Sequence, residues 1–75
     1  MEEFLAQLKK IKKGVDFENE TELFDEGYLD SFDVIRIISM MDKEYDITVP
    51  PSHIVPENFN SAQAMWDLMQ KLENE

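Results

Sequence analysis

Apolar side chains recur at helical spacing in three separate stretches of this chain. Near the start, Phe4, Leu8, Ile11 and Val15 follow the spacing i, i+4, i+7 and i+11, with Leu5 beside them. Positions at this spacing share one face of a helix, so the pattern predicts an amphipathic helix from about Glu2 to Lys13. Gly14 follows as a suitable helix stop.

The second stretch predicts a helix from Ser31 to about Tyr45. Steps of 100° per residue place one arc toward the core: Val34, Ile37, Ile38, Met41 and Tyr45. The opposite arc mixes apolar and polar residues, namely Phe32, Ile35 and Met40 among Asp33, Arg36, Ser39 and Lys43. Such a mixed face suits a helix that docks on a partner. Alternatively, these are isolated surface residues, and Phe32 folds back under the preceding loop.

The third stretch predicts a final helix that begins after Asn60. Asn60 and Gln63 have the spacing of a capping box, and Phe59 and Ala64 that of a hydrophobic staple. Beyond them lies an apolar stripe of Ala62, Met65, Trp66, Met69 and Leu72, with Leu68 alongside. We expect the Met and Trp stripe to be core and not a cofactor site.

Two connections join these helices. Residues 15–30 show no sustained period but hold apolar side chains among acids: Val15, Phe17, Leu23, Phe24, Tyr28 and Leu29. They predict a long loop pinned to the core that leads to Ser31. Pro50, Pro51 and Pro56 limit the stretch up to Phe59 to one short helical turn, over about Ser52–Val55. The elements together predict a single all-α domain over residues 1–75, with three main helices and one short one.

Composition and charge narrow the classes of function. Seventeen acidic against seven basic residues give a net charge of −10, which opposes binding to nucleic acid or anionic membranes. The chain has no cysteine, so disulfides and thiolate zinc sites are excluded and any thiol must be imported. The start lacks the blocks of a signal peptide and no apolar run could span a membrane, so we expect a cytoplasmic protein without membrane insertion.

Four of the basic residues cluster at the end of the first predicted helix: Lys9, Lys10, Lys12 and Lys13. They suit the negative end of the helix dipole, which makes the run a solvated helix end. A specific anion site is the alternative.

The candidate chemistry lies at Ser31, between two aspartates at the start of the second helix. In one interpretation Asp30 caps the helix, Asp33 completes a capping box, and Ser31 is merely the first helical residue. In the other, Ser31 carries an attached anion, since a phosphodiester there would lie beside free backbone N–H groups at the positive end of the helix dipole. The residues alone leave both interpretations open.

The segment Leu23–Asp33, LFDEGYLDSFD, resembles the attachment signature of acyl carrier proteins, in which D-S-[LM] follows a loop that ends in G-x-[LD]. The similarity continues through the second helix into Tyr45–Pro50, and Ser31 matches the modified serine of the family. The resemblance implies a four-helix bundle, monomeric and non-catalytic, with 4′-phosphopantetheine on Ser31. The arm would come from coenzyme A through a phosphopantetheinyl transferase and magnesium.

The resemblance also implies a set of partners and cargoes. An activating ligase would load the arm with a thioester, and acyltransferases or synthases would receive it. The main expectation is a stand-alone acyl carrier in fatty acid, polyketide or related biosynthesis. The alternative is an aminoacyl carrier, because the long stretch from Pro50 to Ser61 and Phe59 look like D-alanyl carrier proteins, although those typically have Gly where Asp33 stands.

Departures from the fatty-acid carriers point to candidate partner residues. Those carriers usually have a leucine after the serine and a more uniformly acidic second helix, whereas this chain has Phe32, Arg36 and Lys43. We therefore expect partner recognition from Asp30, Phe32, Asp33, Ile35 and Arg36. A cleft for an acyl chain would be lined by Val34, Ile38 and Ile54.

Three other interpretations are weaker. A serine hydrolase needs a base, and the only histidine, His53, lies far along the chain with no G-x-S-x-G elbow at Ser31, so we expect His53 to be a surface residue. A calcium site in Asp25, Glu26, Asp30 and Asp33 does not fit EF-hand spacing, and no metal site is expected. An unmodified helical adaptor that binds through the second helix is the serious rival.

Overall fold

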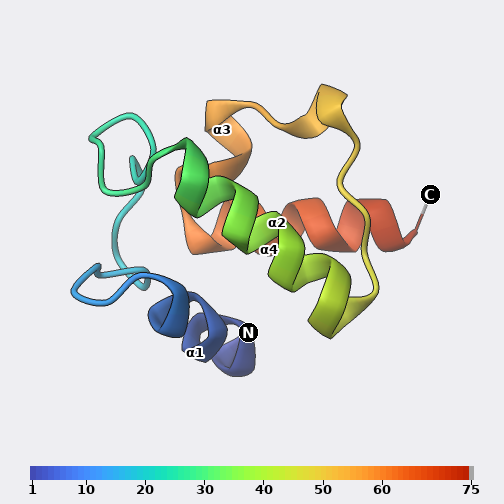
Figure 1. Cartoon of the computed structure of the whole chain (residues 1–75), viewed down its shortest axis with the longest axis horizontal. Helices are drawn as coiled ribbons and strands as arrows, with labels where there is room; N and C mark the ends of the chain where they lie inside the picture. The colour runs from blue at the N-terminus through green and yellow to red at the C-terminus, as the bar shows by residue number, and fades with distance from the viewer. Residues whose placement is uncertain (75) are drawn as a thin grey trace.

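The computed structural model describes residues 1–74 as an all-helical fold without strands in that range. Its three long helices are α1 (Glu2–Ile11), α2 (Ser31–Tyr45) and α4 (Ala62–Glu73). Two short turns lie between α2 and α4: a 3-10 turn η1 (Pro51–His53) and α3 (Pro56–Phe59). In Figure 1, α2 crosses in front of α4, α1 lies along one side, and the long loop of residues 12–30 closes one end.

The core forms where α1, α2 and α4 meet, and it confirms most of the predicted faces. Each helix contributes fully buried side chains, and the loop adds Phe17, Leu23 and Leu29. Beside them, the rings of Phe4, Tyr45 and Trp66 pack with centroids 5.8–6.4 Å apart. The loop is therefore pinned to the core as predicted, which fixes the entry of the chain into α2.

Two details of the predicted faces are wrong. Met40, expected on the outer arc of α2, is buried at 8% exposure because α1 packs against that side of the helix. Tyr28, expected among the apolar side chains that pin the loop, is instead 44% exposed. It follows Gly27, which adopts a positive φ of 82°.

The helix boundaries differ from the predicted ones at three places. α1 ends at Ile11 and not at Lys13, because the backbone of Lys12 is already extended and Gly14 turns the chain at a φ of +83°. The proline-rich stretch forms two turns instead of one. Pro51 and Pro56 each start a turn, where a missing N–H costs nothing.

The third difference concerns the cap of α4. Ser61, not Asn60, is the N-cap residue, and its Oγ accepts a hydrogen bond from the Ala64 amide at 3.0 Å. The Asn60 side chain instead accepts hydrogen bonds from the amides of Phe24 and Asp25, each at 3.0 Å, and donates to the Asp25 carboxylate. Asn60 therefore fastens the long loop to the α3–α4 junction. With Ser61 as the N-cap, Phe59 and Ala64 no longer have the staple positions, and Phe59 is buried as the last residue of α3.

Candidate functional site

The start of α2 is fixed by a reciprocal capping box, as the sequence predicts. The Asp30 carboxylate accepts a hydrogen bond from the Asp33 amide at 2.8 Å, and the Asp33 carboxylate accepts one from the Asp30 amide at 3.1 Å. Ser31 stands between them as the first helical residue, and it is exposed. The two aspartates therefore hold Ser31 at a defined position at the positive end of the helix dipole.

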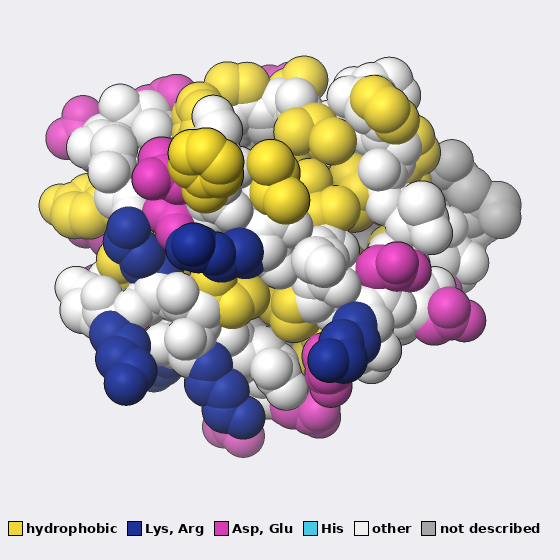
Figure 2. All heavy atoms as spheres, in the orientation of Figure 1, with side chains coloured by type: hydrophobic (Ala, Val, Ile, Leu, Met, Phe, Trp, Pro, Cys, Tyr) yellow, Lys and Arg dark blue, Asp and Glu magenta, His cyan; other side chains and the backbone are white. Residues whose placement is uncertain are grey.

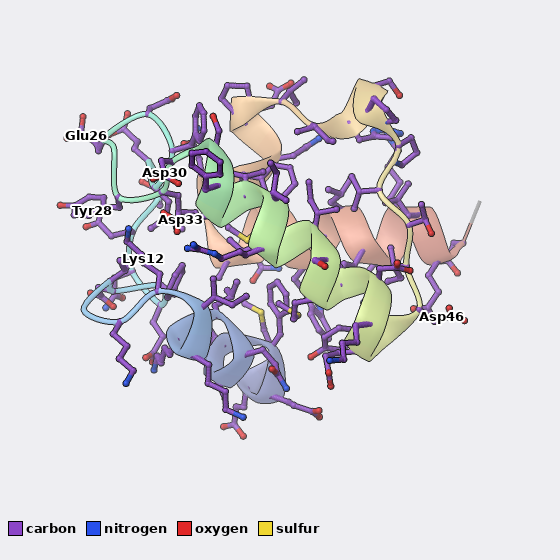
Figure 3. The ribbon with its side chains drawn as sticks, viewed as in Figure 1. Lys12, Glu26, Tyr28, Asp30, Asp33 and Asp46 are labelled. Carbon is purple, nitrogen blue, oxygen red and sulfur yellow. The ribbon has the colours of Figure 1, made fainter. Side chains whose placement is uncertain are left out.

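Asp33 is more than a capping residue, because its side chain is buried at 2% exposure and joins two helices. Its Oδ2 lies 3.0 Å from Lys12 Nζ, just beyond α1, and its Oδ1 lies 3.2 Å from Arg36 Nη1. Figure 3 shows Lys12 reaching across from the α1 end toward Asp33 and Asp30. This ion-pair cluster of Lys12, Asp33 and Arg36 ties the end of α1 to the start of α2.

The protonation of Asp33 follows from these contacts. Burial opposes the charged form, but the hydrogen bond from the Asp30 amide and the Lys12 ammonium outweigh it and lower the pKa of Asp33. Asp33 is therefore ionised at neutral pH. Because it is buried among its own partners, it contributes to the site by positioning Ser31 and not as a free carboxylate on the surface.

An apolar groove of about 320 Å³ opens beside Ser31. Besides Ser31, it is lined by Phe24, Val34, Ile35, Ile38 and Ile54. Its lining includes all three residues predicted from the sequence to line a cleft, Val34, Ile38 and Ile54. Phe24 and Ile35 are absent from that prediction. Phe24 lies in the loop, where no periodicity shows that the chain reaches this side of α2, and Ile35 lies on the arc of α2 that the sequence predicts to face outward.

The outer face of α2 next to Ser31 is unusually apolar. Phe32 is 71% and Ile35 61% exposed, and Ile54 across the groove is 43% exposed. Phe32 therefore does not fold back under the loop. Figure 2 shows yellow side chains gathered over this part of the molecule, with dark blue ones below them.

The structure gives Ser31 no catalytic neighbours within residues 1–74. Its Oγ has no side-chain partner there, and His53 lines a different groove, together with Asn58 and Lys71. No helix in this range is both long and apolar enough to cross a bilayer. What the site offers is an exposed hydroxyl at a fixed helix start, beside free backbone N–H groups and an open groove. These features fit an attached phosphodiester with a flexible arm.

Two kinds of similarity point the same way. The sequence model for the phosphopantetheine attachment site matches residues 3–69. The D-alanyl carrier protein of Lactococcus lactis subsp. lactis is 35% identical over 54 residues, which cover 72% of this chain and 68% of that protein. Aminoacyl carrier protein 1 of Bradyrhizobium diazoefficiens is 36% identical over 64 residues, covering 75% of this chain and 70% of that protein.

A more distant relative covers more of the chain. The D-alanyl carrier protein of Lactobacillus delbrueckii subsp. bulgaricus (strain ATCC BAA-365 / Lb-18) is 28% identical over 64 residues, which cover 83% of this chain and 80% of that protein. The match to the family spans the capped serine, the apolar groove and the helices that form them. The chain therefore belongs to the phosphopantetheine attachment site family, and it is a non-catalytic carrier protein.

Proposed function

We propose that this protein carries an amino acid as a thioester on a phosphopantetheine arm attached to Ser31. The observation that supports Ser31 most directly is its place as an exposed hydroxyl at the first residue of α2, held by the Asp30–Asp33 capping box. The phosphodiester would lie where the first amides of α2 have no partner within the helix. When attached, phosphopantetheine supplies the thiol that this cysteine-free chain lacks.

The relatives, which are named D-alanyl and aminoacyl carrier proteins, support an amino acid as the cargo. The main expectation from sequence, a fatty acyl or polyketide carrier, has less support. The groove beside Ser31, lined by apolar side chains, is the observation that favours an acyl cargo. An amino acid needs no such shelter, so the groove would then hold part of the arm.

A two-step experiment tests the proposal. The protein is first incubated with coenzyme A, magnesium and a broad-specificity phosphopantetheinyl transferase, and its intact mass is measured. We expect one phosphopantetheine on the wild type and on Ser52→Ala, which removes another exposed serine, and none on Ser31→Ala. An adduct that survives Ser31→Ala would disprove the attachment site.

The second step offers the arm-bearing protein to amino-acid-adenylating ligases with ATP and single amino acids, D-alanine included, and to fatty acyl ligases in parallel. We expect aminoacyl thioesters, released by hydroxylamine, and little acyl loading. Efficient loading with fatty acids and none with amino acids would replace the aminoacyl function with the acyl one.

Partner choice is proposed to depend on the exposed side chains next to Ser31. Phe32 and Ile35 present apolar area that nothing in residues 1–74 covers, and Arg36 lies on the same side of α2 with 64% of its side chain exposed. Exposed apolar anchors with an arginine beside them are typical of binding surfaces. Phe32→Ala should raise the KM for loading without lowering the melting temperature, and an unchanged KM would exclude Phe32 as a contact.

A further inference from the structure

A second groove, separate from the one beside Ser31, runs between α1 and α2. It has a volume of about 340 Å³. Ile11 and Met40 contribute its apolar part, with Met40 only 8% exposed. Arg36 and Lys43 line it from α2, together with Ser39 and Glu44, and Gln7 lines it from α1. The groove therefore combines a small apolar floor with a mainly basic edge.

The surroundings of this groove are basic although the protein is strongly acidic. Six of the seven basic residues belong to α1, the two residues after it, and α2: Lys9, Lys10, Lys12, Lys13, Arg36 and Lys43. In Figure 2 the dark blue side chains gather over α1 and the adjoining edge of α2, with yellow between them. The same stretches also hold five acidic residues, so their net charge is +1, against −11 for the rest of the chain: Glu2, Glu3, Asp33, Asp42 and Glu44.

Internal ion pairs do not neutralise this face. Lys12 and Arg36 share the single carboxylate of Asp33, so that cluster retains a net charge of +1. Lys9 pairs with Glu18, whereas Lys43 makes no ion pair within residues 1–74. Arg36 uses Nη1 for Asp33, and most of its side chain is exposed, which leaves further donors for a second carboxylate.

We infer that the α1–α2 groove is a docking site for an acidic segment of a partner protein. One apolar side chain of that segment would enter between Ile11 and Met40, and its carboxylates would face Arg36 and Lys43. Since the rest of the chain is acidic, such a partner is attracted to this face and repelled by the others, which orients the carrier as it docks. The site goes beyond the proposed function, because it does not depend on Ser31 or on the cargo.

A protein segment explains the groove better than an anionic membrane does. A bilayer surface is broad, and most of the protein surface would be repelled by it at a net charge of −10. The apolar part of the site is also small and lies in a shallow groove between two helices, with Ile11 from α1 and Met40 from α2. It is suited to receive a protruding side chain.

The test is an NMR titration of the ¹⁵N-labelled 75-residue chain without its arm. The probes are a synthetic peptide of Glu and Leu, a Lys and Leu peptide of the same length, and phosphatidylcholine vesicles with phosphatidylglycerol. We expect shifts of the Ile11, Arg36, Ser39 and Lys43 amides with the acidic peptide alone, weakening as salt rises. Equal binding of the basic peptide, shifts elsewhere, no binding, or binding of vesicles in place of the acidic peptide would overturn the inference.

Two matched variants show whether the charge at the groove matters. Lys43 and Lys71 are each an exposed basic residue in the last turn of their helix, α2 and α4, but only Lys43 lines this groove. Lys43→Glu should weaken binding of the acidic peptide by about fivefold or more at low salt, and Lys71→Glu should leave it within about twofold. Equal losses in both variants would mean that net charge alone acts, and would refute a local site. Because these titrations need no arm, their failure leaves the attachment at Ser31 unaffected.

Discussion

Replacement of Asp33 by alanine removes the contact that joins the end of α1 to the start of α2. The Asp33 carboxylate accepts hydrogen bonds from Lys12 at 3.0 Å, from the Asp30 amide at 3.1 Å and from Arg36 at 3.2 Å. The lost half of the capping box costs about 1 kcal/mol. The Lys12 pair, whose lysine is 40% exposed, adds about 1 kcal/mol, and the more exposed Arg36 adds a few tenths at most.

We therefore expect Asp33→Ala to lower the free energy of unfolding by about 2 kcal/mol. This is a large share of the roughly 4–11 kcal/mol that holds together a domain of this size. Urea unfolding followed by the fluorescence of Trp66, which is partly buried against the core, measures the loss directly. In a thermal scan the melting temperature should fall by about 10 °C.

Two further variants separate this cause from a general effect of removing acids. Asp42→Asn alters an exposed aspartate of α2 that takes no part in an ion pair within residues 1–74, and it should change stability by less than about 0.5 kcal/mol. In a Lys12→Met background the cost of Asp33→Ala should shrink, because the pair is already broken. A cost below about 0.5 kcal/mol in the wild type, or an equal cost in both backgrounds, would show that the Asp33–Lys12 contact does not stabilise the fold.

Three other predictions concern the same fold. The pKa of Asp33 is lower in the folded protein than its ordinary 3.8, so the stabilisation by its carboxylate is present at neutral pH and is lost as the pH falls below 3.8. The difference in free energy of unfolding between the wild type and Asp33→Asn should therefore narrow below pH 3.8, and a constant difference would contradict this. The Tyr45 hydroxyl is buried without a hydrogen-bond partner among residues 1–74. Tyr45→Phe should therefore leave the free energy of unfolding unchanged or raise it by up to about 1 kcal/mol, and a clear decrease in urea unfolding would show that the hydroxyl has a partner. Asn60→Ala leaves the amides of Phe24 and Asp25 without their acceptor. We expect the free energy of unfolding to fall by about 1–2 kcal/mol and these two amides to exchange hydrogen faster, whereas unchanged exchange would mean that Asn60 does not fasten the loop.

The parts of the fold that follow from local rules were predictable from the sequence. The period of 3.6 residues placed the three long helices, and the spacing of Asp30 and Asp33 predicted the capping box that the structure contains. The cleft residues Val34, Ile38 and Ile54 do line one groove. Its role for a cargo remains a prediction.

What depended on tertiary contacts was not predictable. Met40 is at a helix position that looks external until α1 covers it, and Asn60 has the right spacing for a cap but binds a loop far away in the chain. The sequence predicts Lys12 to be part of a solvated lysine run, but Lys12 pairs with the buried Asp33. Sequence spacing cannot show which lysine of four reaches a carboxylate on another helix.

Attachment of the arm to Ser31 is tested most directly by the intact mass of the protein after incubation with coenzyme A, magnesium and a phosphopantetheinyl transferase. We expect a gain of one phosphopantetheine, located at Ser31 by fragmentation and absent from Ser31→Ala. No gain by a correctly folded wild-type protein, or a gain that Ser31→Ala retains, would contradict the claim that the capped serine at the start of α2 bears the arm.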